Sequence, residues 1–423
     1  MKKLLLVSTA IAGVALLSSP ASAALNMTLG GYFEGYGLYS DNNAPNSDPS
    51  RRSFDFRRDD EIFVNGESTL DNGLTIGAHT QLNIGNTADT ATTTLAPTGL
   101  GTAATTTAAA VVAAVGATTA VSQTQLVDES YLYASGQWGR VNFGEEDGAA
   151  YLLQVAAPSA DSNVDGMRVY VQGLNTVNWD ANLAGLALSY QQADFRQADR
   201  LTYLTPKFNG FQAGISYAPD TSSAFINADN TTSATSSATS SMPLSDVASQ
   251  FKNPWEAAAR WDGRFSGVDL SLGGGYSSAQ GENTTGTGPG IVGSKALDTY
   301  NFGGNVGISG FSLGGAYKHT NNGIESTGAA NDDTKTWDVG GAYDNGPYHA
   351  GLSYFHDTLG NGLLTGATGG DSSVHRYAVG GGYTFGPGMT FRGSVDFGRF
   401  DADTAADTSQ DFTQVTVGTD IQF

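Results

Sequence analysis

Hydrophobic and polar residues alternate along most of the chain with a period of two. Between residues 54 and 70 the apolar side chains share one parity and the polar ones share the other: Phe54, Phe56, Ile62, Val64 and Leu70 against Asp55, Arg57, Asp59, Glu61, Asn65 and Glu67. This period is that of a β-strand with one polar and one apolar face. Residues 74–84 repeat the pattern after an Asp-Asn-Gly turn at residues 71–73, so the two segments predict a β-hairpin.

The same hairpin unit recurs to the end of the chain. Further tight turns are predicted at residues 135–139, 206–210, 264–267, 308–310, 344–347 and 386–388. The hairpins are joined by longer connections rich in Ser, Thr, Asn, Asp and Gly, at residues 40–53, 86–122, 219–253, 277–297, 320–334, 358–372 and 401–411. Short turns at one end and long polar loops at the other are typical of a transmembrane antiparallel β-barrel, in which the turns are periplasmic and the loops extracellular.

The first residues have the pattern of an export signal. Lys2 and Lys3 precede an apolar run from Leu4 to Leu17, and Ala21 and Ala23 occupy the small positions of a cleavage site. We therefore predict a signal peptide at residues 1–23 and a barrel domain at residues 24–423. The apolar run is shorter than the roughly 18 residues of a spanning helix, which leaves a soluble secreted protein or a membrane barrel as the two classes of mature protein.

Composition narrows the functional classes. The apolar fraction is 39%, as expected for strands buried on one face, and 10% aromatic residues argue against disorder. The chain has no cysteine, which excludes a disulfide framework and thiol catalysis. Its five histidines lie outside the H-E-x-x-H spacing, and no G-x-S-x-G elbow stands between a strand and a helix, so we expect no enzyme. A net charge of −21 makes a nucleic-acid partner unlikely on electrostatic grounds.

An acidic stretch, residues 143–172, interrupts the series of strands. Inside it, Asp161, Asn163, Asp165 and Gly166 have the D-x-N-x-D-G spacing that opens a calcium loop. The twelfth position is Gln172 and not the bidentate Glu of such loops. Two interpretations stay open: a structural Ca²⁺ bound by Asp161, Asn163 and Asp165, or a turn that needs no metal.

Four segments resemble the general porins of Gram-negative bacteria, in particular those of alphaproteobacteria: residues 63–82, 128–151, 201–220 and 383–395. The last strand, VTVGTDIQF, ends at Phe423 and is similar to the terminal aromatic signal read by the barrel-assembly machinery. The resemblance implies an outer-membrane homotrimer surrounded by lipid and lipopolysaccharide. Each barrel would have 16 strands and an inward-folded third loop, and would pass small hydrophilic solutes without a required cofactor.

The strand count depends on where the third loop ends. We expect residues 147–199 to form an enlarged third loop, because the LTYLTP strand that follows matches the strand after that loop in relatives. The alternative interprets Asp180 to Asn182 as one more periplasmic turn, which gives 18 strands.

Parity also predicts the pore wall. The expected inward row includes Arg57, Glu61, Glu67, His79, Glu129, Arg260, Arg376 and Arg392. The resemblance implies loop acids facing wall arginines, with Asp147, Asp161 and Asp165 on the acidic side and Arg57, Arg260, Arg376 and Arg392 on the basic side. Glu61 and Glu129 stand near where arginines are expected, and carboxylate rings favour cations, so we predict weak cation selectivity. A substrate-specific outer-membrane channel and a non-conducting surface barrel remain as alternatives.

Overall fold

Sixteen antiparallel strands close into a barrel in which every strand pairs with its neighbours in sequence, and β1 pairs with β16. The computed structural model describes residues 25–42, 53–84, 127–161, 190–192, 194–195, 198–219, 251–281, 295–323, 333–360, 371–401 and 409–423. The expected signal peptide and most of the long connections lie outside these residues. Closure leaves the described sheet without a free edge, as a barrel in lipid requires.

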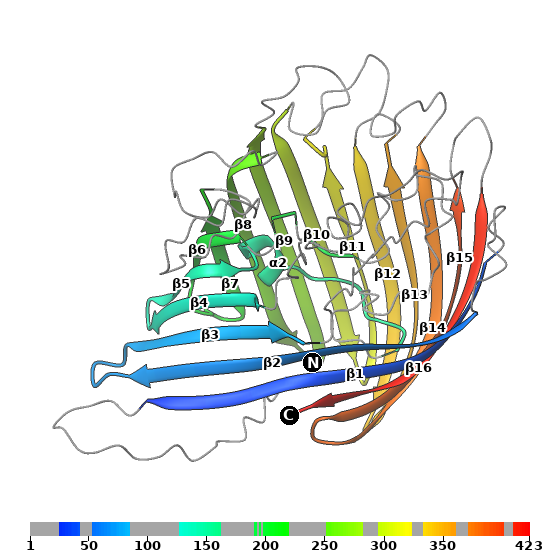
Figure 1. Ribbon diagram of the computed structural model, residues 1–423, viewed down its shortest axis with the longest axis horizontal. Coiled ribbons are helices and arrows are strands. Elements are labelled where there is room, and N and C mark those ends of the chain that lie inside the picture. Colours follow the sequence, from blue (N-terminus) through cyan, green and yellow to red (C-terminus); the bar gives the residue numbers. More distant parts are fainter. Residues whose placement is uncertain are drawn as a thin grey trace, which may run out of the picture.

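The strands are drawn in chain order in Figure 1. Their bounds are β1 Asn26–Asn42, β2 Phe54–Thr69, β3 Thr75–Asn83, β4 Val127–Gly136, β5 Gly139–Glu146, β6 Ala198–Leu204, β7 Phe211–Tyr217, β8 Phe251–Phe265, β9 Val268–Gly281, β10 Leu297–Ile308, β11 Phe311–Thr320, β12 Thr334–Asn345, β13 Tyr348–Leu359, β14 Ser372–Gly386, β15 Met389–Asp401 and β16 Gln410–Gln422. A short helix, α2, spans Ala149–Leu152. Within the described ranges, no helix has the length and hydrophobicity needed to cross a membrane.

The predicted tight turns are confirmed as the hairpin connections. The β2–β3 turn shows the local reason: the Leu70 amide donates to the Leu74 carbonyl at 2.8 Å, and the Gly73 amide donates to the Leu70 carbonyl at 2.9 Å. Gly73 has a φ of 80°, a left-handed conformation that glycine adopts without steric cost. Residue choice at the turn therefore fixes the register of the hairpin.

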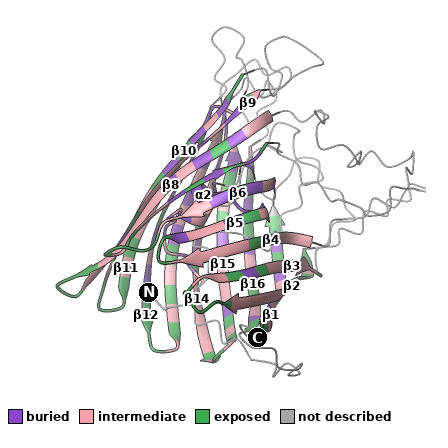
Figure 2. Cartoon of the chain, turned by 90° about the vertical axis from the view of Figure 1, so that its left-hand side faces the viewer, coloured by how far each residue is buried: buried purple, intermediate pink, exposed green. Residues whose placement is uncertain are grey.

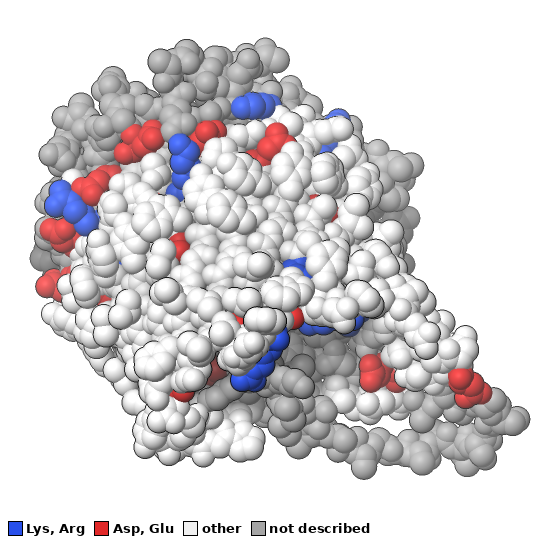
Figure 3. All heavy atoms as spheres, turned by 180° about the vertical axis from the view of Figure 1, so that it is seen from behind, with Lys and Arg blue, Asp and Glu red and all other residues white. Residues whose placement is uncertain are grey.

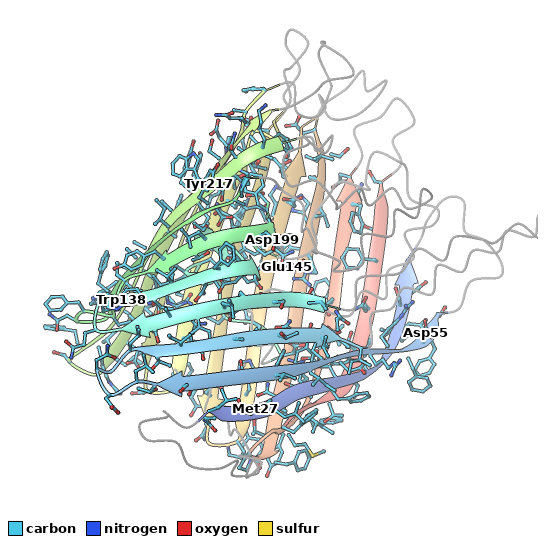
Figure 4. The ribbon with its side chains drawn as sticks, turned by 60° about the vertical axis from the view of Figure 1, so that its left-hand side comes forward. Met27, Asp55, Trp138, Glu145, Asp199 and Tyr217 are labelled. Atoms are coloured by element: carbon cyan, nitrogen blue, oxygen red, sulfur yellow. The ribbon has the colours of Figure 1, made fainter. Side chains whose placement is uncertain are left out.

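The third loop lies between β5 and β6, and its two ends are neighbours in the wall. Glu145 pairs with Asp199, both labelled in Figure 4, and Glu146 pairs with Ala198. Because β5 hydrogen-bonds directly to β6, the wall has no place for two further strands between them. The prediction of 16 strands is confirmed and the alternative of 18 is wrong; the turn proposed for it at residues 180–182 lies outside the described residues.

The two faces of the wall differ in polarity. Exposed and buried positions alternate along the strands (Figure 2), and the outward positions carry apolar side chains such as Leu313, Leu352 and Val379, which are 59%, 63% and 56% exposed. Figure 3 shows one outer face as a broad uncharged area, with Lys, Arg, Asp and Glu gathered mainly along its margin. An apolar band of this kind faces lipid, where a charged side chain is costly.

Candidate functional site

The inner face of the barrel is the candidate site, and the strand register decides which residues reach it. Directly opposed residues in neighbouring strands point to the same side. The register places all eight predicted wall residues on the inner face: Arg57, Glu61, Glu67, His79, Glu129, Arg260, Arg376 and Arg392. They are distributed around the barrel, with the acidic ones and His79 on β2–β4 and three of the four arginines on β8, β14 and β15.

Residues Gly148–Asp161, called the strap here, run from the end of β5 across the inner surface. The strap begins with α2, which lies inside the ring of strands (Figure 1). Ala150 and Leu153 pack against Ala258 of β8 and Leu204 of β6 in a small apolar cluster. The strap therefore rests on the wall from its first turn.

Side chains of the wall hold the start of α2. The Ala149 amide donates to Ser216 Oγ at 3.1 Å, and the Ala150 amide donates to Glu256 Oε2 at 2.9 Å. The first amides of a helix have no partner within the helix, and α2 has no capping side chain of its own. Glu256 also forms a buried ion pair with Arg200, with 3.0 Å between Arg200 Nη1 and Glu256 Oε1.

The rest of the strap is fastened through its backbone. Arg260 Nη1 donates to the Gln154 carbonyl at 3.2 Å, and Asn305 Nδ2 donates to the Ala156 carbonyl at 2.9 Å. The Ala157 amide donates to Asp338 Oδ2 at 3.3 Å. Further along, His349 Nε2 lies 3.1 Å from the Ser159 carbonyl oxygen. Successive anchors come from β8, β10, β12 and β13, so the strap follows the wall around the barrel.

Inward glycines make room for the strap. A Cβ atom on Gly273 would come within 2.8 Å of a Val155 methyl group, and one on Gly351 within 2.6 Å of the Ser159 carbonyl oxygen. Added at Gly303 or Gly340, a Cβ atom would overlap the backbone carbonyl of the strap. These glycines, on β9, β10, β12 and β13, form a shallow track that allows the strap backbone to approach the sheet. We call the inner faces of β7–β14 the strap wall.

The third loop returns along the same wall. Lys318 Nζ donates to the Gln191 carbonyl at 2.9 Å, and the Tyr190 hydroxyl donates to the Tyr317 carbonyl at 3.3 Å. The Gln192 amide donates to Gln154 Oε1 at 2.9 Å, which joins the returning segment to the strap. Burial raises the pKa of the Asp194 carboxyl in this segment, and burial raises the pKa of the Tyr190 hydroxyl, because both charged forms lose hydration there.

The opposite part of the inner face, β16 and β1–β4, carries larger and more acidic side chains, and we call it the acidic wall. Its carboxylates are Glu34, Asp59, Glu61, Glu67, Glu129 and Asp420. Aromatic rings lie between them: His79 stacks on Tyr131 with 5.0 Å between ring centroids, and Phe63 lies 6.1 Å from His79. The Tyr133 hydroxyl donates to Glu67 Oε2 at 2.8 Å.

The predicted loop acids have different surroundings. Asp147 is buried at the base of the strap, beside Glu146. Asp161 ends the described strap and interacts electrostatically with both Arg376 and Arg392. Asn163 and Asp165 lie outside the described residues, so the calcium prediction stays a prediction. In the part of the chain that the structure describes, no group of three His, Asp or Glu side chains is arranged to hold a metal ion.

The wall arginines have carboxylate partners. Arg260 Nε lies 2.9 Å from Asp262 Oδ2, Arg376 Nη1 lies 3.8 Å from Asp396 Oδ1, and Arg392 Nη2 lies 2.7 Å from Glu34 Oε1. Arg57 pairs with Asp55 at 3.1 Å and is half exposed. These pairings reduce the net positive charge that the arginines present to the lumen.

Several residues of this arrangement were not predicted. Ser216, Glu256 and Asn305 anchor the strap, and their inward parity was available from the alternation of β7, β8 and β10. Glu34, together with Tyr36, contacts Arg392 across the barrel closure, where Arg392 Nε donates to the Tyr36 hydroxyl at 2.8 Å. In the sequence, both β1 residues are indicated by the polar side chains at alternate positions of residues 32–40, a pattern that glycines partly obscure.

Comparison with known proteins gives one family. The sequence profile described as Gram-negative porin matches residues 8–404. Among solved structures, the chain is similar to the anion-selective porin from Comamonas acidovorans, with 15% identity, coverage of 95% of this chain and 100% of the other, and a TM-score of 0.54. It is also similar to Salmonella typhi OmpF in complex with daunomycin, with 16% identity, coverage of 94% and 98%, and a TM-score of 0.55. At these identities the likeness concerns the fold.

Curated relatives are matched over a shorter length. The uncharacterized protein RC0098 of Rickettsia conorii is 27% identical over 127 residues, which are 26% of this chain and 29% of that protein. A Rickettsia felis protein, also described as uncharacterized, is 28% identical over 127 residues, with the same coverage of 26% and 29%. The chain thus matches less than a third of the length of these relatives.

Proposed function

The chain belongs to the Gram-negative porin family and is an outer-membrane β-barrel, and we propose that it forms a water-filled channel for the passive diffusion of small hydrophilic solutes and ions. The observation that carries the proposal is the division of the inner face. The strap lies against one wall instead of being packed on all sides, and the opposite wall presents carboxylates, a histidine and tyrosines. Side chains cannot fill the lumen of a barrel of this size.

We further propose a preference for cations. The acidic wall concentrates carboxylates, whereas the arginines of the inner face have carboxylate partners close by. A negative potential along the lumen raises the local concentration of cations. The name of the Comamonas relative describes an anion-selective porin, so the shared fold leaves selectivity to the residues of each inner face.

The assembly is proposed to be a homotrimer in contact with lipid and lipopolysaccharide. It would be inserted by the barrel-assembly machinery through the C-terminal strand. That strand closes the barrel: the Phe423 amide donates to the Gly31 carbonyl at 3.0 Å, and the Gly31 amide donates to the Phe423 carbonyl at 2.9 Å. Phe423 is 52% exposed. Native mass spectrometry of detergent-extracted protein measures the subunit number.

Planar-bilayer recording tests the channel proposal. We expect steady ohmic current steps and, under a KCl gradient, a reversal potential of the sign produced by K⁺ flow. Block of the current by one solute at low concentration would favour the substrate-specific alternative. Absence of steps from protein that is folded and inserted would contradict the channel and favour a surface barrel, and a reversal potential of opposite sign would contradict cation preference.

A further inference from the structure

The anchors of the strap differ in how they respond to pH. Ser216 and Asn305 carry hydroxyl and amide groups, which do not titrate in the physiological range. His349 is the histidine among the strap anchors described above, and its unperturbed pKa, about 6.5, lies near neutrality. Glu256 and Asp338 are the other titratable anchors, and a pH effect due to them would persist without the His349 ring. His349 is also the last of these hydrogen-bonding anchors along the strap, and its partner Ser159 lies two residues before Asp161.

His349 lies between two hydrogen-bond acceptors. Its Nε2 atom is 3.1 Å from the Ser159 carbonyl oxygen, and its Nδ1 atom is 3.0 Å from Asp344 Oδ1. Carbonyl and carboxylate oxygens accept hydrogen bonds and do not donate them. A neutral imidazole has one N–H group and can donate to only one of these partners, whereas an imidazolium donates to both. The geometry therefore matches the protonated side chain.

The charges around His349 are acidic. Asp344 faces it from β12, and Asp161 interacts with it electrostatically from the strap. On the other side, β14 presents Gly382, which carries no charge, and Arg392 of β15 lies one strand further on, opposite Gly382. His349 itself is 12% exposed, while Asp344 is 49% exposed, so protons can reach the pair from water.

We propose that His349 is a positioning residue, one that fastens the end of the strap to β13 when protonated and releases it when neutral. The inference rests on the proposed channel function. The sign follows from the contacts: attachment is complete at low pH, where both donors are present, and weakens as the pH rises, because the one remaining N–H group then serves either Asp344 or the Ser159 carbonyl. Release frees the segment that carries Asp161, so the current should fluctuate more at high pH.

The experiment compares H349Q with the unsubstituted protein in single-channel recordings between about pH 5.5 and 8.5, a window centred on histidine titration. In the unsubstituted protein we expect the time spent in brief sub-conductance states to rise about tenfold across this window. This rise corresponds to a loss of about 1.4 kcal/mol in the free energy of strap attachment. In H349Q we expect the same behaviour at every pH, because an amide does not titrate in this window. We call this tenfold rise with pH the pH step. Retention of the pH step in H349Q would overturn the inference, as would its absence from the unsubstituted protein.

The control variant is H79Q. His79 also faces the lumen and is hydrogen-bonded, with 2.6 Å between its Nδ1 and Asn65 Oδ1, but it belongs to the acidic wall. H79Q should keep the pH step. If it abolishes the step while H349Q does not, the pH sensor lies on the acidic wall and the proposal is wrong.

A second measurement does not require conduction. Amide hydrogen exchange of a peptide covering residues 155–161, corrected for the intrinsic pH dependence of exchange, should be faster at high pH in the unsubstituted protein and unchanged by pH in H349Q. Complete absence of current steps would contradict the channel proposal, and the exchange data would still decide the role of His349. Exchange that does not depend on pH in the unsubstituted protein would contradict attachment through His349.

Discussion

The strap wall and the acidic wall are two parts of one inner face, yet they use opposite kinds of residue. The strap wall presents glycines such as Gly303 and Gly340, where even a Cβ atom would overlap the strap backbone. The acidic wall presents long side chains, including Glu61 and Tyr131. Inward positions of the acidic wall can thus carry long polar and aromatic side chains. Where the strap rests on the wall, inward positions carry glycine or side chains that hydrogen-bond to backbone groups of the strap.

The largest expected effect is the loss of the buried ion pair on the strap wall. E256Q keeps an acceptor for the Ala150 amide but leaves Arg200 without its buried counter-charge, which should cost about 3–5 kcal/mol. Urea unfolding in lipid vesicles measures the loss, and chymotrypsin cleavage near Tyr151 reports detachment of α2. The acidic-wall variant E129Q is the control, because Glu129 is 18% exposed and pairs loosely with His79 at 3.9 Å. Equal losses in the two variants would remove the distinction between the walls.

Filling the glycine track should have the next largest effect. G340L inserts a side chain where the Pro158 carbonyl lies, and overpacking of this kind costs about 1–3 kcal/mol. The strap must move toward the lumen, so single-channel conductance should fall. The neighbouring outward glycine gives a matched control: at Gly341 an added Cβ atom would meet Ser312 O at an ordinary 3.5 Å, so G341L should conduct normally. Normal conductance in G340L would show that the strap is not seated on this track.

Neutralising the acidic wall should change selectivity and leave stability almost unaltered. In E67Q/E129Q the cation-to-anion permeability ratio should fall about two- to fivefold, because a carboxylate a few ångströms from a hydrated ion contributes up to about 1 kcal/mol. Reversal potentials under a salt gradient measure the ratio. D411N is the control, since Asp411 is exposed and pairs with Arg399. An unchanged ratio in E67Q/E129Q would assign selectivity to another part of the channel.

The smallest effect is expected at the exposed ion pair of β2. R57Q removes the partner of Asp55, but Arg57 is 55% exposed, and such pairs contribute about 0–1 kcal/mol, less in high salt. Thermal unfolding at low and at high salt measures this difference. A loss comparable to that of E256Q would mean that burial does not separate the two classes of ion pair in this barrel.

Much of the wall could be predicted from the sequence because alternation carries face information. Parity predicted that Glu61 and His79 share the lumen face, and the register puts both on the inner face. Turn chemistry predicted the turn at Asp71–Gly73, and its hydrogen bonds confirm it. Parity and turn chemistry depend on neighbours in sequence or on one period, which is what a single chain displays. The strand count was predicted differently, from the match of the LTYLTP strand to the strand after the third loop in relatives, and the pairing of β6 with β5 confirms it.

The position of the strap against the wall could not be predicted, for a physical reason. A glycine has no side chain, so nothing in the segment VGGA of β12 indicates that a backbone segment rests on the inward Gly340 and none on the outward Gly341. The strap is held through backbone groups, and the alternation of β12 puts Asp338 on the inner face without any indication of its partner. That partner, the Ala157 amide, is 181 residues away, and backbone amides carry no sequence signature.

The separation of the strap from its anchors also sets an order of events in folding. Ser159 meets His349 across 190 residues, and the glycine track continues onto β12 and β13, so the strap has no complete seat until the C-terminal half of the sheet has formed. Contacts of such long range form after local hairpins, because the intervening chain must first be ordered. Narrowing of the lumen is therefore a final step of maturation, and a barrel whose later strands are misaligned would remain wide and leaky.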